Sequence, residues 1–133
     1  MTSPKQVAIR SDFDIVTART TARDLAKQLG FGAIDQARIA TAVSELARNI
    51  FLYAGMGTVS VCMVELRGRR GIEIVCADSG PGIADLERVM QDGYSTSRGM
   101  GMGLPGAKRL MDEFDLQSQE GVGTTVTCRK WRA

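Results

Sequence analysis

The sequence contains no histidine, and this absence narrows the chemistry that the chain can perform. Without histidine, a serine–histidine or cysteine–histidine catalytic pair cannot form within the chain, and the chain cannot be phosphorylated on histidine. An enzyme built from this sequence must therefore rely on carboxylates, amides, cations and bound metal ions.

Long apolar runs and long runs of one charge are also missing. No stretch approaches the roughly 20 apolar residues of a membrane-spanning helix, and the first residues lack the apolar segment of a secretory signal. The net charge is only +2, without the basic stripe that nucleic-acid-binding proteins carry. We therefore expect a cytoplasmic protein that binds neither membranes nor nucleic acid.

Cysteine is scarce, and its spacing fits no zinc motif. Cys62, Cys76 and Cys128 each lie in an apolar, strand-like run, which favours a role as small buried side chains. What the sequence does contain is the composition of an ordinary globular protein, with 44% hydrophobic and 24% charged residues. A length of 133 residues predicts one domain, over residues 1–133, with its own core.

Hydrophobic periodicity predicts the element order β-α-α-β-β-α-loop-α-β-β. The first helix is expected to begin near Ser11 and to end at Gly30, and the second to run from a cap at Asp35 to Tyr53. Strands are expected at 7–9, 58–66, 72–77, 115–119 and 124–131, further helices at 84–90 and 104–114, and a mobile loop at 91–102. This order predicts an α+β fold, a two-layer α/β sandwich whose mixed, mostly antiparallel sheet carries helices on one face.

Glu45 and Asn49 lie four residues apart in the second predicted helix, so their side chains share one helix face. The Asn49 amide oxygen suits a hard cation such as Mg2+, which also takes phosphate oxygens and waters. Glu45, one turn earlier, is placed to orient or deprotonate an attacking hydroxyl group. The alternative is a solvated pair beside a packing face, and the pair alone does not decide between the two.

Asp78 follows a predicted strand and begins an Asp-Ser-Gly-Pro-Gly segment. A carboxylate at a strand end, inside an apolar wall, can accept a hydrogen bond from the exocyclic amine of adenine, whereas guanine presents a carbonyl group there. Gly80 and Gly82 permit a sharp turn and a close approach of the backbone to a base. The same five residues also make an ordinary turn that needs no ligand.

Gly99, Gly101 and Gly103 resemble a phosphate-binding loop that leads into a helix. Bare backbone amides and a helix N-terminus both favour anions. The glycines follow no strand, as a dinucleotide fingerprint would, and they lack the Gly-Lys-Ser/Thr ending of a P-loop. Arg98 would reach a terminal phosphate, and hydroxyl contacts would come from Ser95, Thr96 and Ser97. A plain flexible glycine loop is the alternative.

Read together, in this order and at these separations, the three segments resemble the N, G1 and G2 boxes of the GHKL ATPase/kinase superfamily. Gly121-Val122-Gly123-Thr124 looks like the last box of that superfamily, and the match runs from Asp35 onward. The small size is similar to that of the bacterial anti-sigma and stressosome switch kinases. The resemblance implies the superfamily's ATP-binding fold, with ATP and Mg2+ as cofactors. One departure is that residues 50–55 lack the histidine that many relatives carry after the asparagine.

The resemblance also implies a role for each site residue. Asn49 would hold Mg2+, Asp78 would read adenine, Glu45 would be the catalytic base, and Arg98 would act on the terminal phosphate. The phosphates would be enclosed by Gly99, Gly101, Gly103 and Leu104, and the rest of the nucleotide site would come from Gly80, Gly82, Ser95, Thr96 and Thr124. For Thr124, a plain strand position is the alternative.

The activity implied by the resemblance is that of a serine/threonine-protein kinase in the general stress response. It would phosphorylate STAS-domain proteins of the stressosome, both scaffold and antagonist, and would activate a PP2C-type phosphatase when released. The alternative is an anti-sigma factor, a nucleotide-dependent binding module that sequesters a sigma factor and phosphorylates its antagonist. A gyrase-B-like ATPase and a histidine-kinase fragment fit less well, since neither a transducer domain nor a histidine-bearing helix is apparent. The oligomeric state stays open, with a homodimer among the alternatives.

Overall fold

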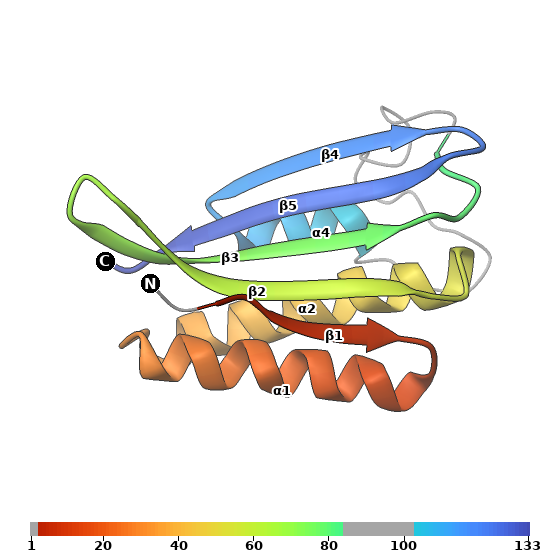
Figure 1. The fold of residues 1–133 in the computed structure, drawn as a ribbon. Helices are drawn as coiled ribbons and strands as arrows, with labels where there is room; N and C mark the ends of the chain where they lie inside the picture. The colour runs from red at the N-terminus through yellow and green to blue at the C-terminus, as the bar shows by residue number, and fades with distance from the viewer. Residues whose placement is uncertain (1–2, 84–102) are drawn as a thin grey trace.

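The computed structural model describes residues 3–83 and 103–133, which form one sheet with helices on one of its faces (Figure 1). The strand order is β1-β2-β3-β5-β4, and each neighbouring pair among the described strands is antiparallel. The strands are β1 (Lys5–Ile9), β2 (Gly57–Leu66), β3 (Arg69–Asp78), β4 (Glu113–Gln119) and β5 (Gly123–Trp131), and the helices are α1 (Asp12–Gln28), α2 (Ala33–Tyr53) and α4 (Gly103–Leu110). The expected α+β sandwich is confirmed. The helix expected at 84–90 and the loop expected at 91–102 lie outside the described residues.

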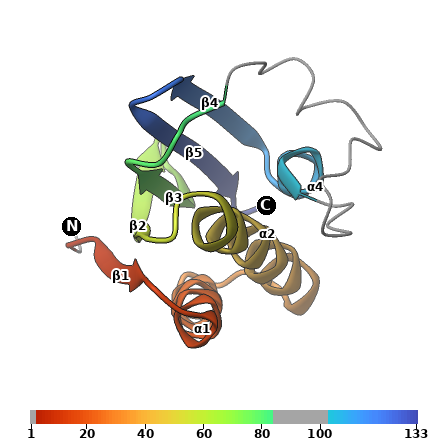
Figure 2. The same ribbon diagram turned by 90° about the vertical axis from the view of Figure 1, so that its right-hand side faces the viewer.

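Helix α2 occupies the centre of the helical layer. It packs against α1 on one side and α4 on the other, beneath the sheet (Figure 2). Its apolar stripe faces inward because the buried residues recur at helical spacing, and they include Ile39, Val43, Leu46 and Ile50. From the sheet, the core receives Val59 and Ile74 among others. Each such large side chain contributes about 1.5–3 kcal/mol when it is fully buried.

The helix ends follow local backbone signals. Ser11 is the N-cap of α1, and Gly30 ends that helix with a φ of 91°, as its sequence position predicts. The prediction that Asp35 caps α2 is wrong, because Gly32 is the N-cap. Asp35 lies in the first turn instead, where its carboxylate accepts a hydrogen bond from Arg38 at 3.0 Å. Its charge still favours the helix N-terminus from this position.

The helix expected over 104–114 is too long. Helix α4 ends at Leu110, and Phe114 belongs to β4. The backbone N–H of Asp112 donates to the carbonyl of Arg129 at 2.9 Å, so the chain already joins β5 there. Phe114 then packs against the core from the strand, in an alternating pattern of half-buried and exposed residues. Pairing with β5 therefore decides the structure of this segment, which is a strand rather than the end of a helix.

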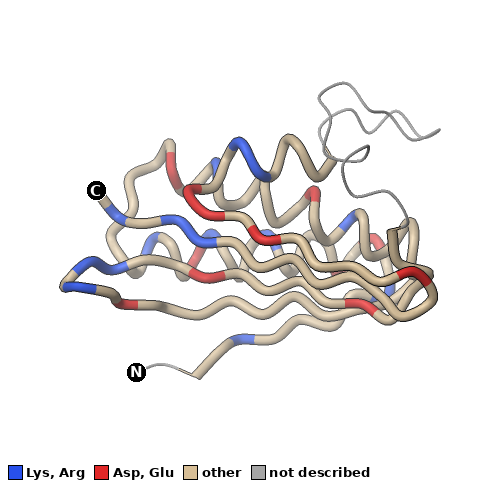
Figure 3. The backbone as a smooth tube through the Cα atoms, turned by 90° about the horizontal axis from the view of Figure 1, so that it is seen from above, with Lys and Arg blue, Asp and Glu red and all other residues tan. Residues whose placement is uncertain are grey.

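The face of the sheet turned away from the helices carries charged side chains. Arg129 donates to Glu73 at 2.8 Å and to Glu113 at 3.4 Å, which ties β3, β5 and β4 together. The β2–β3 turn adds Arg67, Arg69 and Arg70, at the end of β3 opposite Asp78 (Figure 3). The basic turn therefore lies far from Asp78 and from Thr124, the register partner of Asp78. None of the described helices has the length and apolar character needed to cross a membrane.

Candidate functional site

Glu45 lies on the fourth turn of α2, with its side chain 13% exposed. Its Oε1 accepts a hydrogen bond from Nη1 of Arg48 at 3.1 Å. Arg48 is not among the predicted site residues, although its spacing of three residues from Glu45 on a helix is a usable signal. The ion pair restricts the Glu45 carboxylate to a defined orientation, which is a requirement for a group that positions a reacting hydroxyl.

Asn49 lies one turn further along α2 and is half-buried. Within the described part of the chain, no protein group forms a hydrogen bond with its side-chain amide. A half-buried amide without a protein partner is available to a ligand, and its oxygen is of the hard, neutral kind that Mg2+ accepts. Residues 3–83 and 103–133 contain no group of three carboxylates or cysteines that could hold a metal by themselves.

Asp78 is the last residue of β3, and its side chain lies on the face that the helices cover, the same face as Ile74 and Cys76. Its Oδ1 accepts a hydrogen bond from the backbone N–H of Gly80 at 2.9 Å. Across the sheet, Asp78 is the register partner of Thr124. The carboxylate is thus fixed at the end of a central strand, as the sequence predicts, and no group of residues 3–83 and 103–133 donates a hydrogen bond to its Oδ2.

Close backbone packing leaves no room for a side chain at three glycines around Asp78. A Cβ atom on Gly80 would lie 2.5 Å from the Cβ of Ala54, at the end of α2. A Cβ atom on Gly82 would lie 2.2 Å from the Gln119 carbonyl oxygen, and one on Gly123 would lie 2.2 Å from the Asp78 carbonyl oxygen. The loop after Asp78 is therefore wedged between the end of α2 and the β4–β5 turn.

Ser118 on β4 also holds the loop that follows Asp78. Its Oγ accepts a hydrogen bond from the N–H of Ile83 at 2.7 Å and lies 2.7 Å from the Thr124 hydroxyl oxygen. The neighbouring N–H of Gly121 donates to the carbonyl of Pro81 at 2.7 Å. Ser118 is not among the predicted site residues, because its role depends on a contact with a residue 35 positions away. Both ends of the Asp78 loop are therefore held by β4 and β5.

Gly57, the first residue of β2, links Asp78 to α2. A Cβ atom placed on Gly57 would lie 2.6 Å from Cγ2 of Ile50 and 3.1 Å from Cβ of Asp78. Ile50 follows Asn49 directly in the helix. The structure thus brings the predicted metal-binding amide and the predicted base-reading carboxylate to the same end of the domain.

Helix α4 begins at this end with Gly103, which has a positive φ of 36°, and with Leu104, which is buried in the core. It packs against α2, so its N-terminus is positioned relative to Glu45 and Asn49. The remaining residues of the predicted phosphate loop lie outside the described residues, and they are Ser95, Thr96, Ser97, Arg98, Gly99 and Gly101.

The cysteines provide no activated thiol. Burial raises the pKa of Cys76 well above its ordinary value and raises the pKa of Cys128 to about 12. Cys62 is half-buried, and its pKa is raised by burial and then by the nearby carboxylate of Glu73. All three are free thiols. The prediction of small buried side chains is confirmed for Cys76 and Cys128, and Cys62 is only partly covered.

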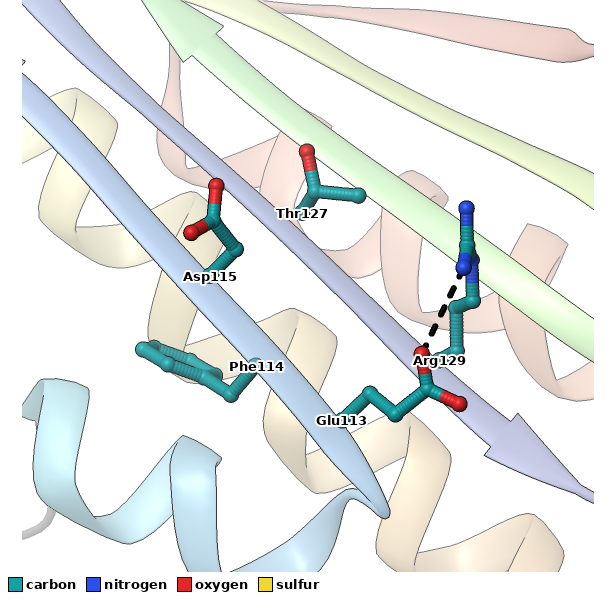
Figure 4. Close-up of a pocket in the computed structure, with 5 residues that line it drawn as sticks. All are labelled: Glu113, Phe114, Asp115, Thr127 and Arg129. Carbon is teal, nitrogen blue, oxygen red and sulfur yellow. Dashed lines mark hydrogen bonds and ion pairs between the residues drawn. The ribbon is translucent and has the colours of Figure 1, made fainter.

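A separate cavity of about 380 Å3 lies across β4 and β5. Figure 4 shows its lining residues, which are Glu113, Phe114, Asp115, Thr127 and Arg129. None of the predicted site residues within 3–83 and 103–133 lines it. The carboxylate of Glu113 is already paired with Arg129, and the cavity lies on strands rather than at the end of the domain where Asp78 sits.

Comparison with known sequences gives a consistent result. Residues 10–130 match the family described as histidine kinase-like ATPase domain. The chain is 57% identical to the serine/threonine-protein kinase RsbT of Bacillus subtilis (strain 168) over 125 residues, which cover 94% of each chain. It is 33% identical to the anti-sigma F factor of Caldanaerobacter subterraneus subsp. tengcongensis over 120 residues, which cover 86% of this chain and 82% of that protein.

Solved structures share the fold. The RsbU and RsbW domains of a Mycobacterium tuberculosis protein align with 99% of this chain and 34% of that one, with a TM-score of 0.66 and 19% identity. A mycobacterial sensor histidine kinase, MprB, aligns over 99% of both chains, with a TM-score of 0.57 and 17% identity. At these identities the likeness concerns the fold alone.

Proposed function

This chain belongs to the family of histidine kinase-like ATPase domains, and we propose that it transfers the terminal phosphate of Mg-ATP to a serine or threonine of small STAS-type partner proteins. Its enzyme class is protein serine/threonine kinase. The observation that carries the proposal is the 57% identity, over 94% of both chains, to a relative that bears that class name.

The arrangement around Asp78 supports adenine binding. We assign the Asp78 carboxylate to the exocyclic amine of adenine, because the hydrogen bond from Gly80 occupies Oδ1 and leaves Oδ2 for the base. The glycines that wedge the loop against α2 and the β4–β5 turn keep side chains away from the base, and Thr124 lies beside the carboxylate on β5. The proposed base-reading group is therefore fixed before the ligand arrives.

Asn49 fits the proposed metal. Its amide oxygen lacks a protein partner within the described residues and is a hard donor, as Mg2+ requires. When bound, Mg2+ offsets negative charge on the phosphates. In the proposal, Arg98 contributes positive charge at the terminal phosphate. The phosphates are held by Gly99, Gly101, Gly103 and Leu104, with hydroxyl groups from Ser95 and Thr96.

Glu45 is the proposed catalytic base. The partner's hydroxyl oxygen attacks the terminal phosphorus in line with the bond to the departing oxygen of ADP. The bond from phosphorus to the partner's oxygen forms as the bond to ADP breaks, and the hydroxyl proton passes to the Glu45 carboxylate. Arg48 holds that carboxylate through the ion pair at 3.1 Å. The acceptor comes from another protein, so the reaction depends on a docked partner.

We place the output of the kinase in a stressosome switch in the cytoplasm. Phosphorylation of the STAS scaffold and antagonist releases the kinase, which then activates a PP2C-type phosphatase. The relationship to RsbT supports this reading. The anti-sigma relatives support the second candidate, a binding module that sequesters a sigma factor and phosphorylates its antagonist.

Binding assays with purified partners distinguish the two candidates. The wild-type protein, with Mg-ADP or Mg-ATP, is titrated with a cognate PP2C-type phosphatase and, separately, with a sigma factor of the same organism. The switch predicts binding and activation of the phosphatase, with no stable complex with the sigma factor. A tight, nucleotide-dependent complex with the sigma factor and no effect on the phosphatase would support the anti-sigma function instead.

A further inference from the structure

A buried lysine of β5, Lys130, joins three elements of the fold. Its side chain is only 9% exposed, and its Nζ donates a hydrogen bond to the carbonyl oxygen of Leu110, the last residue of α4, at 2.9 Å. The same Nζ lies 3.7 Å from Oδ1 of Asp112 and 3.9 Å from Oδ1 of Asp35. Lysine is almost never buried to this extent unless it is paired, so this placement is a specific feature of the fold.

The contact with Leu110 acts on the end of α4. The last carbonyl groups of a helix have no partner within the helix, and a cation there satisfies one of them and complements the helix dipole. Helix α4 has only eight residues, and a helix so short is not stable by itself in water. Its orientation therefore depends on neighbours, and among the described residues these include the apolar contacts of Leu104 and Ala107 and the bond from Lys130.

The contact with Asp35 extends the link to α2. Asp35 lies in the first turn of the helix that carries Glu45 and Asn49 further along. Two hydrogen bonds lie next to the lysine in the sequence: the backbone N–H of Asp112 donates to the Arg129 carbonyl at 2.9 Å, and the backbone N–H of Trp131 donates to the side-chain Oδ2 of Asp112 at 2.8 Å. The starting end of α2 and the final end of α4 are thus held to the same segment of β5 (Figure 1).

We propose that Lys130 is a positioning residue of the kinase. By fixing α4 against α2, it sets the place of Gly103 and Leu104, at the other end of α4, relative to the phosphates held over Asn49. This inference rests on the proposed ATP-binding function. Lys130 contacts neither the nucleotide nor the acceptor in this account, and it acts through α4 on the phosphate part of the ligand alone.

The test compares a ligand with phosphates and a ligand without them. In Lys130→Met, the ammonium group is lost while the apolar stem is retained. Mutations of residues that connect two sites change the coupling free energy between those sites by about 0.5–2 kcal/mol. We therefore expect the Kd of Mg-ATP to rise by the corresponding factor of about 2- to 30-fold. The Kd of adenosine, measured by NMR titration, is expected to stay constant. Lys130 pairs with Ile72 near the start of β3, whereas Asp78, the proposed adenine-binding residue, lies at the opposite end of that strand. Lys130→Arg is expected to restore most of the Mg-ATP affinity.

Arg129→Met is the matched control. Arg129 is the adjacent cation on β5, but its side chain lies on the other face of the sheet and pairs with Glu73 and Glu113. We expect this variant to leave the ratio of the two Kd values unchanged, whatever its effect on stability. Urea unfolding of each variant confirms that binding is measured on folded protein. If Lys130→Met does not fold, Lys130→Gln takes its place; it loses the charge that faces Asp35 and Asp112, and we expect a smaller rise of the Mg-ATP Kd in the same direction.

Two results would overturn the inference. One is an unchanged Mg-ATP affinity in folded Lys130→Met, or in the Lys130→Gln variant that replaces it, and the other is an equal loss of Mg-ATP and adenosine affinity in that variant, which indicates only a general loss of structure. A shift of the ratio in Arg129→Met would also contradict it. Failure of the proposed function is separate, because in that case the wild-type protein itself would not bind Mg-ATP or transfer phosphate.

Discussion

Asp78 on β3 and Thr124 on β5 are register partners, and both side chains point to the face of the sheet that the helices cover. The Asp78 carboxylate accepts from Gly80, and the Thr124 hydroxyl oxygen lies 2.7 Å from that of Ser118. Both polar groups are therefore held in place by the protein alone. Such preorganisation lowers the ordering cost of binding a base at this position.

Asp78→Asn should lower ATP affinity while the fold stays intact. The asparagine oxygen can still accept from Gly80, but its NH2 group would face the adenine amine, donor against donor. Loss of a charge-assisted hydrogen bond of 1.5–3 kcal/mol corresponds to a rise in Kd of about 10- to 150-fold. Calorimetric titration with Mg-ATP measures this. Asp115→Asn, an exposed aspartate on β4, is the control. Unchanged binding in folded Asp78→Asn would remove the base-reading role.

The glycines of the β4–β5 turn should differ sharply in their tolerance of alanine. Gly121 has a φ of 80° and open space around it, so alanine there should cost only the conformational penalty of about 1 kcal/mol. At Gly123, the new Cβ would lie 2.2 Å from the Asp78 carbonyl oxygen. Gly123→Ala should therefore cost about 2 kcal/mol or more and should weaken ATP binding by displacing Asp78. Urea unfolding and titration of both variants test this. Equal behaviour of the two variants would contradict the packing argument.

Glu45→Gln should separate binding from transfer. Mg-ATP affinity is expected to stay close to that of the wild type, whereas phosphate transfer should fall by about 10²- to 10⁴-fold, the usual range for a general base. Arg48→Met keeps the carboxylate but removes its 3.1 Å partner, so transfer should fall less. Since Arg48 is partly exposed, its loss should cost under about 1 kcal/mol of stability. Full transfer by Glu45→Gln would show that the base lies elsewhere.

The thiols should react in two groups that are separated by their burial. Iodoacetamide should label Cys62 in the folded protein, and Cys76 and Cys128 only after unfolding, because burial raises the pKa of both. Since burial and then Glu73 raise the pKa of Cys62, Glu73→Gln should lower that pKa and shift the pH profile of labelling to lower pH. Mass spectrometry against pH measures both effects. Two labels on folded protein, or a shift to higher pH, would contradict the assignment.

Elements with strong periodicity could be predicted from the sequence. The stripe of Ile39, Val43, Leu46 and Ile50 predicts α2, and the apolar run before Asp78 predicts both β3 and the carboxylate at its end. These signals are local, since each depends on residues a few positions apart. The glycine at position 30 likewise ends its helix as predicted.

Contacts between distant residues could not be predicted in this way. Ser118 forms hydrogen bonds with Ile83 and Thr124 only because the sheet brings β4 beside the loop that follows Asp78. Lys130 reads as one cation in a basic C-terminal segment, and its contact with Leu110 appears only once α4 is packed. The boundary at Phe114 was misjudged because pairing with β5, rather than local helical spacing, decides that segment.

The most direct test of the central claim is transfer of labelled phosphate from Mg-ATP to a cognate STAS-domain protein. The account predicts label on a serine or threonine of that protein with the wild-type chain, and loss of label with Asp78→Asn. ATP binding without transfer to any STAS partner would contradict the kinase function and would support a nucleotide-gated binding module.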